Sequence, residues 1–337
     1  MDHITVRHIV EAVSGTLLCG DADTELKHIS IDSRSMRGAD LFVPLIGEKS
    51  DAHRFLVQAM DNGAAAALTS EHEAAPEGFH GALIQVKDTK LALQTIGRCL
   101  RARLSIPLVG ITGSVGKTTT REMVAAALSA KYKTFKTPAN HNSQIGVPLT
   151  ISEISENDEI GVLELGMSEP GEMAVIAEIA AVDSAVMTNI GVTHIENLGS
   201  RENILKEKLH IQDGMKAGGI LFVNGDNDML SAVVAVLCRA RHLVILSDID
   251  GFYDHDPRLY PNAKLIEQID TIDDSVYALA GGAGSRRGTG GMRTKLQAAA
   301  LATSQGTDTI VTNGKHPEAL YDIVKGLHAG TLFPGKI

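Results

Sequence analysis

The sequence predicts an α/β protein built on parallel sheets with helices on both faces. Short apolar runs at 106–113, 159–167, 183–191 and 218–226 have the length and composition of buried strands. An Ala-rich helical stretch at 171–181 separates two of them, and such strand–helix alternation is typical of parallel sheets. The 33 glycines fit the many tight turns of this fold class.

The first 85 residues alternate in the same way and predict a small α/β domain. Its expected elements are helices at 4–14 and 52–62, strands at 27–34, 41–47 and 83–88, and a strand or short buried segment at 63–70. A helix at 90–103 is expected to lead into a second domain. The third part has expected helices at 229–240, 292–304 and 317–327 and strands at 242–248 and 307–314. We therefore expect three domains, at 1–85, 86–225 and 226–337.

The composition excludes several classes of partner. The net charge is −10, from 31 Lys and Arg against 41 Asp and Glu, whereas nucleic acids and anionic membrane surfaces attract basic faces. The cysteines Cys19, Cys99 and Cys238 lack metal-ligand spacing, so we expect neither a zinc site nor a disulfide framework. The chain shows no signal peptide and no apolar run of about 18 residues, and a reducing cytoplasm is its expected location.

A glycine-containing loop joins the strand at 106–113 to a predicted helix at 118–131. Its residues are Thr112, Gly113, Ser114, Val115, Gly116, Lys117, Thr118 and Thr119. Backbone N–H groups in such a loop point at phosphate oxygens, and the helix N-terminus adds a favourable dipole. Lys117 can bridge β- and γ-phosphates, and the Thr118 hydroxyl can bind Mg²⁺. The loop therefore predicts an ATP–Mg²⁺ site, with a plain helix-capping turn as the alternative.

The loop departs from the Walker pattern G-x-x-x-x-G-K-[ST], because Ile111 stands where that pattern has its first glycine. The Mur ligases share this departure, and the loop resembles theirs. Further stretches resemble the same family in order along the chain, at 32–34, 38–43, 137–150, 163–168 and 188–208. The stretch at 137–150 resembles in particular the members that add D-alanyl-D-alanine.

This resemblance implies an ATP-dependent ligase of peptidoglycan synthesis, which joins D-alanyl-D-alanine to UDP-MurNAc-tripeptide through an acyl phosphate. Lys117, Glu164, His194 and Lys208 would carry the chemistry, and Lys208 would react with CO₂ to form a carbamate. The implied ligands are Asn140 and Asn142 for the nucleotide, Thr118, Glu164, His194 and Lys208 for Mg²⁺, and Asp32, Ser33 and Arg34 for the UDP group. Taken singly, these residues have plainer interpretations as a helix cap, surface side chains and a turn.

From residue 225 on, the sequence resembles the glutamate 5-kinases of the amino-acid kinase family. The matching stretches include G-D-N-D-M-L-S-A at 225–232, S-D-I-D-G-F-Y at 247–253 and G-T-G-G-M-R-T-K at 288–295. The resemblance implies L-glutamate binding by Asn227 and Asp228, and nucleotide binding by Ser247, Asp248, Thr289, Gly290, Gly291, Met292 and Lys295. A glycine loop that opens a helix, with a lysine one turn in, is a second plausible phosphate cradle. A flexible loop beside a solvated lysine is the alternative.

Two partial enzymes thus meet near 224–228, where both families have a similar short string. Recombination, or a join made in sequence assembly, would connect two genes at such a string. We expect neither complete reaction from the chain as written, because the ligase's amine-binding domain and the kinase's amino-terminal half are not recognisable in it. The ligase, the glutamate kinase and a non-catalytic ATP-binding chimera remain competing functions. The sequence specifies no oligomeric state.

Overall fold

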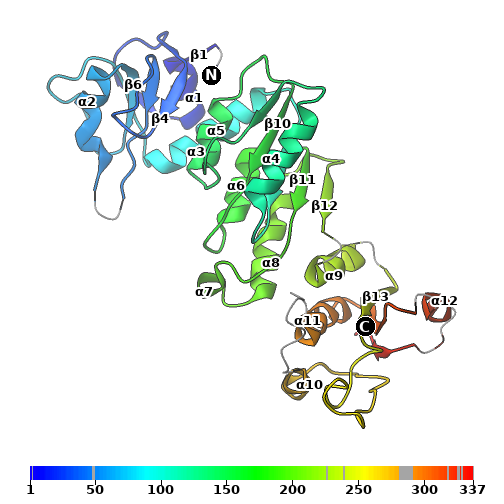
Figure 1. Cartoon of the computed structure of the whole chain (residues 1–337). Coiled ribbons are helices and arrows are strands. Elements are labelled where there is room, and N and C mark those ends of the chain that lie inside the picture. The colour runs from blue at the N-terminus through cyan, green and yellow to red at the C-terminus, as the bar shows by residue number, and fades with distance from the viewer. Residues whose placement is uncertain are drawn as a thin grey trace. The chain divides into compact units, whose positions relative to one another are not determined.

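The computed structural model describes residues 1, 3–47, 50–224, 227–237, 240–280, 291–316, 319–324, 327 and 329–336 (Figure 1). The chain forms two compact units, Met1–Phe222 and Val223–Ile337. Parallel strand pairs occur in both, so the predicted α/β fold class is confirmed. The predicted domain boundaries after residues 85 and 225 stay predictions.

The first unit begins with a five-stranded sheet of order β2-β7-β6-β5-β4. Its strands are β2 (Thr16–Cys19), β4 (His28–Ser30), β5 (Asp40–Phe42), β6 (Ala64–Thr69) and β7 (Ala82–Gln85). Only the β2–β7 pair among these is antiparallel. A small ladder and three helical segments complete this region: β1 (Ile4–Thr5), β3 (Glu25–Leu26), α1 (Val6–Val13), η1 (Ala52–Phe55) and α2 (Leu56–Asp61). Phe42, Leu56, Met60 and Leu83 form its buried core.

The second sheet of this unit has the order β12-β11-β8-β10-β9, which places β8 at its centre. The strands are β8 (Leu108–Thr112), β9 (Thr134–Lys136), β10 (Ile160–Glu164), β11 (Ser184–Met187) and β12 (Ile220–Val223). β8 pairs in parallel with β10 and β11, so that Glu164 is the partner of Ile111 and Met187 is the partner of Thr112. The carboxyl ends of three strands therefore meet at one sheet edge, where ligands bind in such folds.

Helices pack around this sheet: α3 (Thr89–Arg103), α4 (Lys117–Leu128), α5 (Gly146–Ser152), α6 (Glu172–Ala180), α7 (Ile195–Leu198), α8 (Arg201–Leu209) and the short η2 (His210–Gln212). α4 packs against β8, β9 and β10, whereas α3 packs against α5 and α6. The lack of a side chain at Gly97 allows α3 to pack closely against α5. A Cβ at this position would lie only 2.9 Å from the Pro148 Cβ.

The second unit contains the three-stranded sheet β13-β14-β15. β13 (His242–Ser247) is parallel to β14 (Asp308–Asn313), and β15 (Thr331–Phe333) is antiparallel to β14. The helices described are α9 (Asp228–Leu237), α10 (Asp274–Leu279), α11 (Met292–Thr303) and α12 (Ala319–Val324), of which α9 and α11 pack together. The core includes Phe252, Leu296 and Phe333. Within the described ranges, no helix has the length and apolar content needed to cross a membrane.

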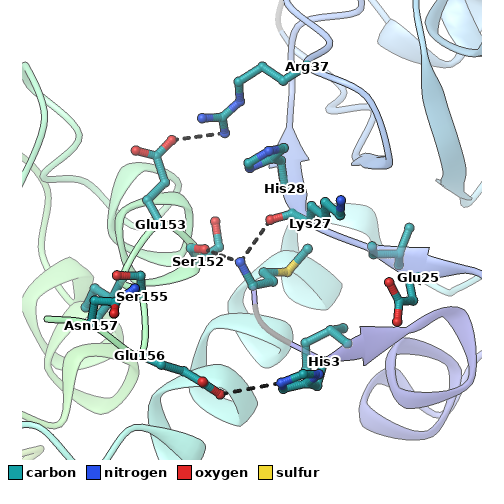
Figure 2. A pocket seen from close by; sticks show the side chains of 14 residues that line it. His3, Glu25, Lys27, His28, Arg37, Ser152, Glu153, Ser155, Glu156 and Asn157 are labelled. Carbon is teal, nitrogen blue, oxygen red and sulfur yellow. Dashed lines mark hydrogen bonds and ion pairs between the residues drawn. The ribbon is translucent and has the colours of Figure 1, made fainter.

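A cavity of about 600 Å³ lies between the first strands of the chain and the α5–β10 connection (Figure 2). Arg37 spans it to Glu153, with 3.2 Å between Nη2 and Oε1, and the Met1 amino group donates to the Ser152 carbonyl at 3.2 Å. Its lining mixes both signs of charge. The α5–β10 connection precedes β10, so the cavity and Glu164 lie at opposite ends of that strand.

Candidate functional site

The predicted phosphate loop connects the central strand β8 to α4. Gly113 and Gly116 have φ angles of +143° and +84°, in the region that favours glycine. A Cβ on Gly113 would also lie 2.0 Å from the Thr188 Oγ1, whereas nothing lies within 4 Å of the corresponding point on Gly116. Backbone conformation therefore requires both glycines, and packing requires Gly113 as well. Thr112 is fully buried, and Thr118 and Thr119 are exposed.

Lys117 is the first residue of α4, and its side chain folds back over the loop. Its Nζ donates a hydrogen bond to the Gly113 carbonyl at 3.0 Å. Burial lowers the pKa of Lys117, and the nearby Glu164 charge partly opposes that shift. The lysine therefore places a positive charge beside the helix N-terminus.

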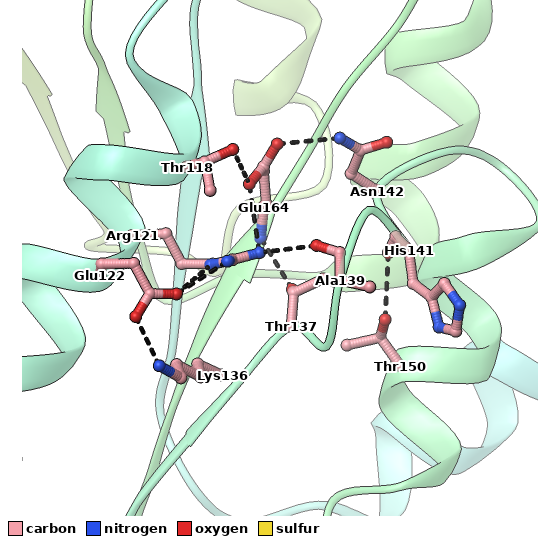
Figure 3. A network of polar contacts seen from close by, with 10 residues as sticks. All are labelled: Thr118, Arg121, Glu122, Lys136, Thr137, Ala139, His141, Asn142, Thr150 and Glu164. Carbon is pink, nitrogen blue, oxygen red and sulfur yellow. Dashed lines mark hydrogen bonds and ion pairs between the residues drawn. The ribbon is translucent and has the colours of Figure 1, made fainter.

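Glu164 is the buried centre of a polar network (Figure 3). Its carboxylate accepts hydrogen bonds from the Thr118 hydroxyl at 3.0 Å and from the Asn142 amide at 2.9 Å. Its backbone N–H donates to the Thr137 hydroxyl at 2.9 Å. Because Glu164 is only about 2 % exposed, these contacts replace the water that the carboxylate gives up. The structure thus brings three of the predicted residues, Thr118, Asn142 and Glu164, into direct contact.

Arg121 and Glu122 belong to the same network, and the sequence motifs do not identify them. The Arg121 Nη1 lies 3.3 Å from the Glu164 Oε2 and donates to the Ala139 carbonyl at 3.0 Å. A hydrogen bond from Lys136, and to a smaller extent one from Arg121, lowers the pKa of Glu122. A signal was available, because helix positions 118 and 121 lie three residues apart and share a face.

Lys208 lies in α8 and is about 1 % exposed, whereas Lys206 on the same helix is exposed. Burial, and then the charge of Lys117, lowers the Lys208 pKa to about 8. The neighbouring Glu207 bonds to the N–H groups of Gly171 and Met173, at 3.0 and 2.9 Å, and so holds the start of α6.

His194 and Asn140 are not drawn into the network. In the described part of the chain, neither side chain makes a hydrogen bond, and His194 has a left-handed backbone with φ of 66°. No group of three or more His, Cys, Asp or Glu side chains forms among the described residues that could hold a metal. Of the four predicted Mg²⁺ ligands only Glu164 and His194 are of those kinds, so this absence does not test the set. The predicted Mg²⁺ site therefore stays a prediction.

Asp32, Ser33 and Arg34 form a compact turn after β4. The Arg34 guanidinium donates two hydrogen bonds to the Asp32 carboxylate, at 2.9 and 2.8 Å. These bonds lower the pKa of Asp32 to about 2. Ser33 is buried, and its hydroxyl donates to the Gln58 side chain at 3.1 Å. The exposed Arg34 and part of Asp32 are thus the groups that this turn presents to solvent.

In the second unit, Ser247 and Asp248 lie at the carboxyl end of β13, and Asp248 pairs with Arg258. Asn227 caps α9, because its Oδ1 accepts the Leu230 N–H at 3.2 Å. Gly291 caps α11, which begins at Met292 and has Lys295 in its first turn. Thr289, Gly290 and the Asp228 side chain lie outside the described residues.

Family models match the chain in two places. Residues 25–102 match the model described as Mur ligase family, catalytic domain, and residues 111–266 match the Mur ligase middle domain. The first match lies wholly in the first unit, and the second lies mainly in it. The second match runs past Val223, although β13 pairs in a different sheet from β8–β12.

Individual relatives agree with this class. The UDP-N-acetylmuramoyl-tripeptide–D-alanyl-D-alanine ligase of Bacillus subtilis is 42% identical over 227 residues, which are 67% of this chain and 50% of that protein. A crystal structure of MurF from Acinetobacter baumannii matches with a TM-score of 0.62 and 32% identity, over 67% of this chain and 49% of that one. The MurF ligase of Thermotoga maritima in complex with ADP matches with a TM-score of 0.54 and 34% identity, over 60% and 46%.

A separate segment is similar to another enzyme. The glutamate 5-kinase of Clostridium perfringens is 54% identical over 112 residues, which are 33% of this chain and 42% of that protein. The chain spans about half the length of the ligases it matches, and less than half of this kinase.

Proposed function

We propose that the first unit holds the ATP-binding and UDP-substrate-binding parts of a ligase that joins D-alanyl-D-alanine to UDP-N-acetylmuramoyl-tripeptide. The 42% identity to the Bacillus subtilis enzyme supports this assignment. The observation that carries it is the network at the sheet edge, in which Glu164 holds Thr118 beside Lys117 at the start of α4.

The loop has the charge that a triphosphate requires, and nothing crowds it at Gly116. Lys117 and the α4 N-terminus supply positive potential, and the surface over Gly116 is open. The similar MurF ligase of Thermotoga maritima is in complex with ADP, which supports a nucleotide for this chain too. In the reaction, the lysine would neutralise charge on the transferring phosphoryl group while the loop holds it in position.

Mg²⁺ fits the oxygen donors at this edge, and it would neutralise phosphate charge. Thr118 and Glu164 would hold it, with His194 and carbamylated Lys208 by resemblance. Glu164 is poised for this role, because its carboxylate already faces the Thr118 hydroxyl.

Lys208 suits the proposed carbamate chemistry. The neutral amine attacks CO₂, forms an N–C bond and releases a proton, which leaves an anionic carbamate. With a pKa of about 8, about 10% of the amine is neutral at pH 7, against about 0.03% for an ordinary lysine. Burial therefore favours the reactive form of this side chain.

For the second unit we propose a nucleotide- and L-glutamate-binding half of a glutamate kinase, so that the chain joins segments of two enzymes. The 54% identity over 112 residues supports this second function. Ser247, Asp248, Gly291, Met292 and Lys295, with Thr289 and Gly290, would bind nucleotide, and Asn227 and Asp228 would bind glutamate.

Replacing Lys117 tests the first proposal. Lys117→Ala removes a charge-assisted contact worth roughly 1.5–3 kcal/mol, so affinity for ATP–Mg²⁺ should fall about 10- to 150-fold in titration calorimetry. The exposed Lys206→Ala is the matched control and should leave affinity unchanged. Equal affinity in the wild type, Lys117→Ala and Lys206→Ala would show that the loop does not bind the nucleotide. Repeating the titration with Lys295→Ala identifies any residual binding at the second unit.

A further inference from the structure

Asn189 follows β11 and lies against the predicted phosphate loop. Its Oδ1 accepts the Val115 N–H at 3.1 Å, and its Nδ2 donates to the Val115 carbonyl at 3.1 Å. The Thr188 hydroxyl donates to the same carbonyl at 2.7 Å. Both backbone polar groups of Val115 are therefore held by side chains, much as a neighbouring strand would hold them.

The surrounding contacts extend the pairing of β8 with β11 into the loop. Thr188 N–H donates to the Thr112 carbonyl, and Ser114 N–H donates to the Asn189 carbonyl, both at 3.0 Å. The Gly191 N–H donates to the Ser114 hydroxyl at 2.9 Å. Val115 is 61 % exposed, so Thr188 and Asn189 hold this residue through its backbone alone.

This arrangement divides the N–H groups of residues 114–119 into two sets. Those of Ser114 and Val115 are bound to Asn189. Among the residues that the structure describes, the N–H groups of Gly116, Lys117, Thr118 and Thr119 bind no protein acceptor. Four adjacent donors at the start of a 12-residue helix are thus free to bind an anion.

We propose that Asn189 is a positioning residue: it clamps Val115 before nucleotide arrives, so that phosphate is bound by the N–H groups of Gly116–Thr119 and not by that of Val115. This inference rests on the proposed nucleotide function of the loop. The clamp lowers the conformational entropy that the loop would otherwise lose on binding, because the backbone of at least one residue is fixed in advance.

Amide hydrogen exchange of the nucleotide-free full chain, resolved at Val115, tests the clamp directly. The wild type should protect this amide, Asn189→Leu should lose the protection, and Asn189→Asp should keep it because a carboxylate oxygen can still accept the bond. Asn157→Leu, at an exposed position just before β10, is the matched control and should match the wild type. Rapid exchange at Val115 in the wild type would overturn the proposal.

ATP affinity tests the consequence. Asn189→Leu should bind ATP–Mg²⁺ about 5- to 30-fold more weakly than the wild type, because one or two loop residues are then no longer fixed before binding. If the Leu variant does not fold, Asn189→Ser, which cannot span to both Val115 groups, replaces it. Protection lost without a loss of affinity would overturn the positioning role. A wild type that protects Val115 but binds no ATP would instead contradict the proposed function.

Discussion

Lys208 illustrates how burial changes the behaviour of a single residue. Its pKa in the folded chain is about 8, below the ordinary value of 10.5. Between these values the unfolded chain binds more protons than the folded one. The free energy of unfolding should therefore rise with pH from about 8 to 10.5, and the penalty of the buried charge is fully present below that window.

This gives a prediction for Lys208→Met. Between pH 8 and 10.5 this residue should raise the free energy of unfolding of the wild type by on the order of 3 kcal/mol. The variant should lack that increase. Urea unfolding of the first unit at pH 7.5 and 10.5, in CO₂-free buffer, measures it. Lys206→Met is the control for an exposed lysine and should keep the wild-type slope. Parallel slopes for all three would contradict a depressed pKa at Lys208.

The sequence motifs named residues that the fold brings together, but they did not reveal the contacts of those residues. Thr118, Glu164 and Asn142 were all expected and lie together. Arg121 was missed although it shares a helix face with Thr118, because its contact with Glu164 depends on β10 lying next to α4. Ser33 was expected at the substrate, but its hydroxyl binds Gln58, a partner 25 residues away that no three-residue motif could reveal. Its role in substrate binding stays a prediction.

At the scale of elements, periodicity predicted the strands and helices that expose one face. It missed α5 because all of its residues are buried, so apolar and polar positions do not alternate. It missed α8 because that helix buries the charged Glu207 and Lys208 beside Ile204 and Leu205. Sheet order was also out of reach, because β8 pairs with β11 across a long stretch of intervening chain.

The close contact between α3 and α5 yields a second prediction. Gly97→Ala would gain about 1 kcal/mol of helix propensity, but its Cβ would lie 2.9 Å from the Pro148 Cβ and 3.1 Å from the Ile179 Cγ2. Overpacking of this kind typically costs about 1–3 kcal/mol, so the net effect should be a loss of stability.

Chemical denaturation of the first unit measures the balance. Ala102→Gly, at an exposed position of the same helix, gives the propensity difference without the contact and should cost about 1 kcal/mol. If Gly97→Ala stabilised the unit by that same amount, the helices would have room that the structure does not show.

At the scale of the whole molecule, the division into two units predicts separate unfolding transitions. Leu163 lies in the core of the first unit and Leu296 in the core of the second, and both are fully buried. Leu163→Ala should destabilise only the first transition, and Leu296→Ala only the second, each by about 2–5 kcal/mol. Tyrosine fluorescence and circular dichroism during urea unfolding would resolve them. A single transition that both substitutions shift equally would show that the chain unfolds as one body.

The clamp on Val115 also has a consequence for protein synthesis. The loop leaves the ribosome early, but the side chains that hold it, Thr188 and Asn189, are made more than 70 residues later. A nascent chain that has emerged only through α6 therefore has the glycines and the lysine of the loop without its fixed shape. Competence to bind nucleotide should arise late and abruptly during translation, when β11 and the residues just after it join the sheet.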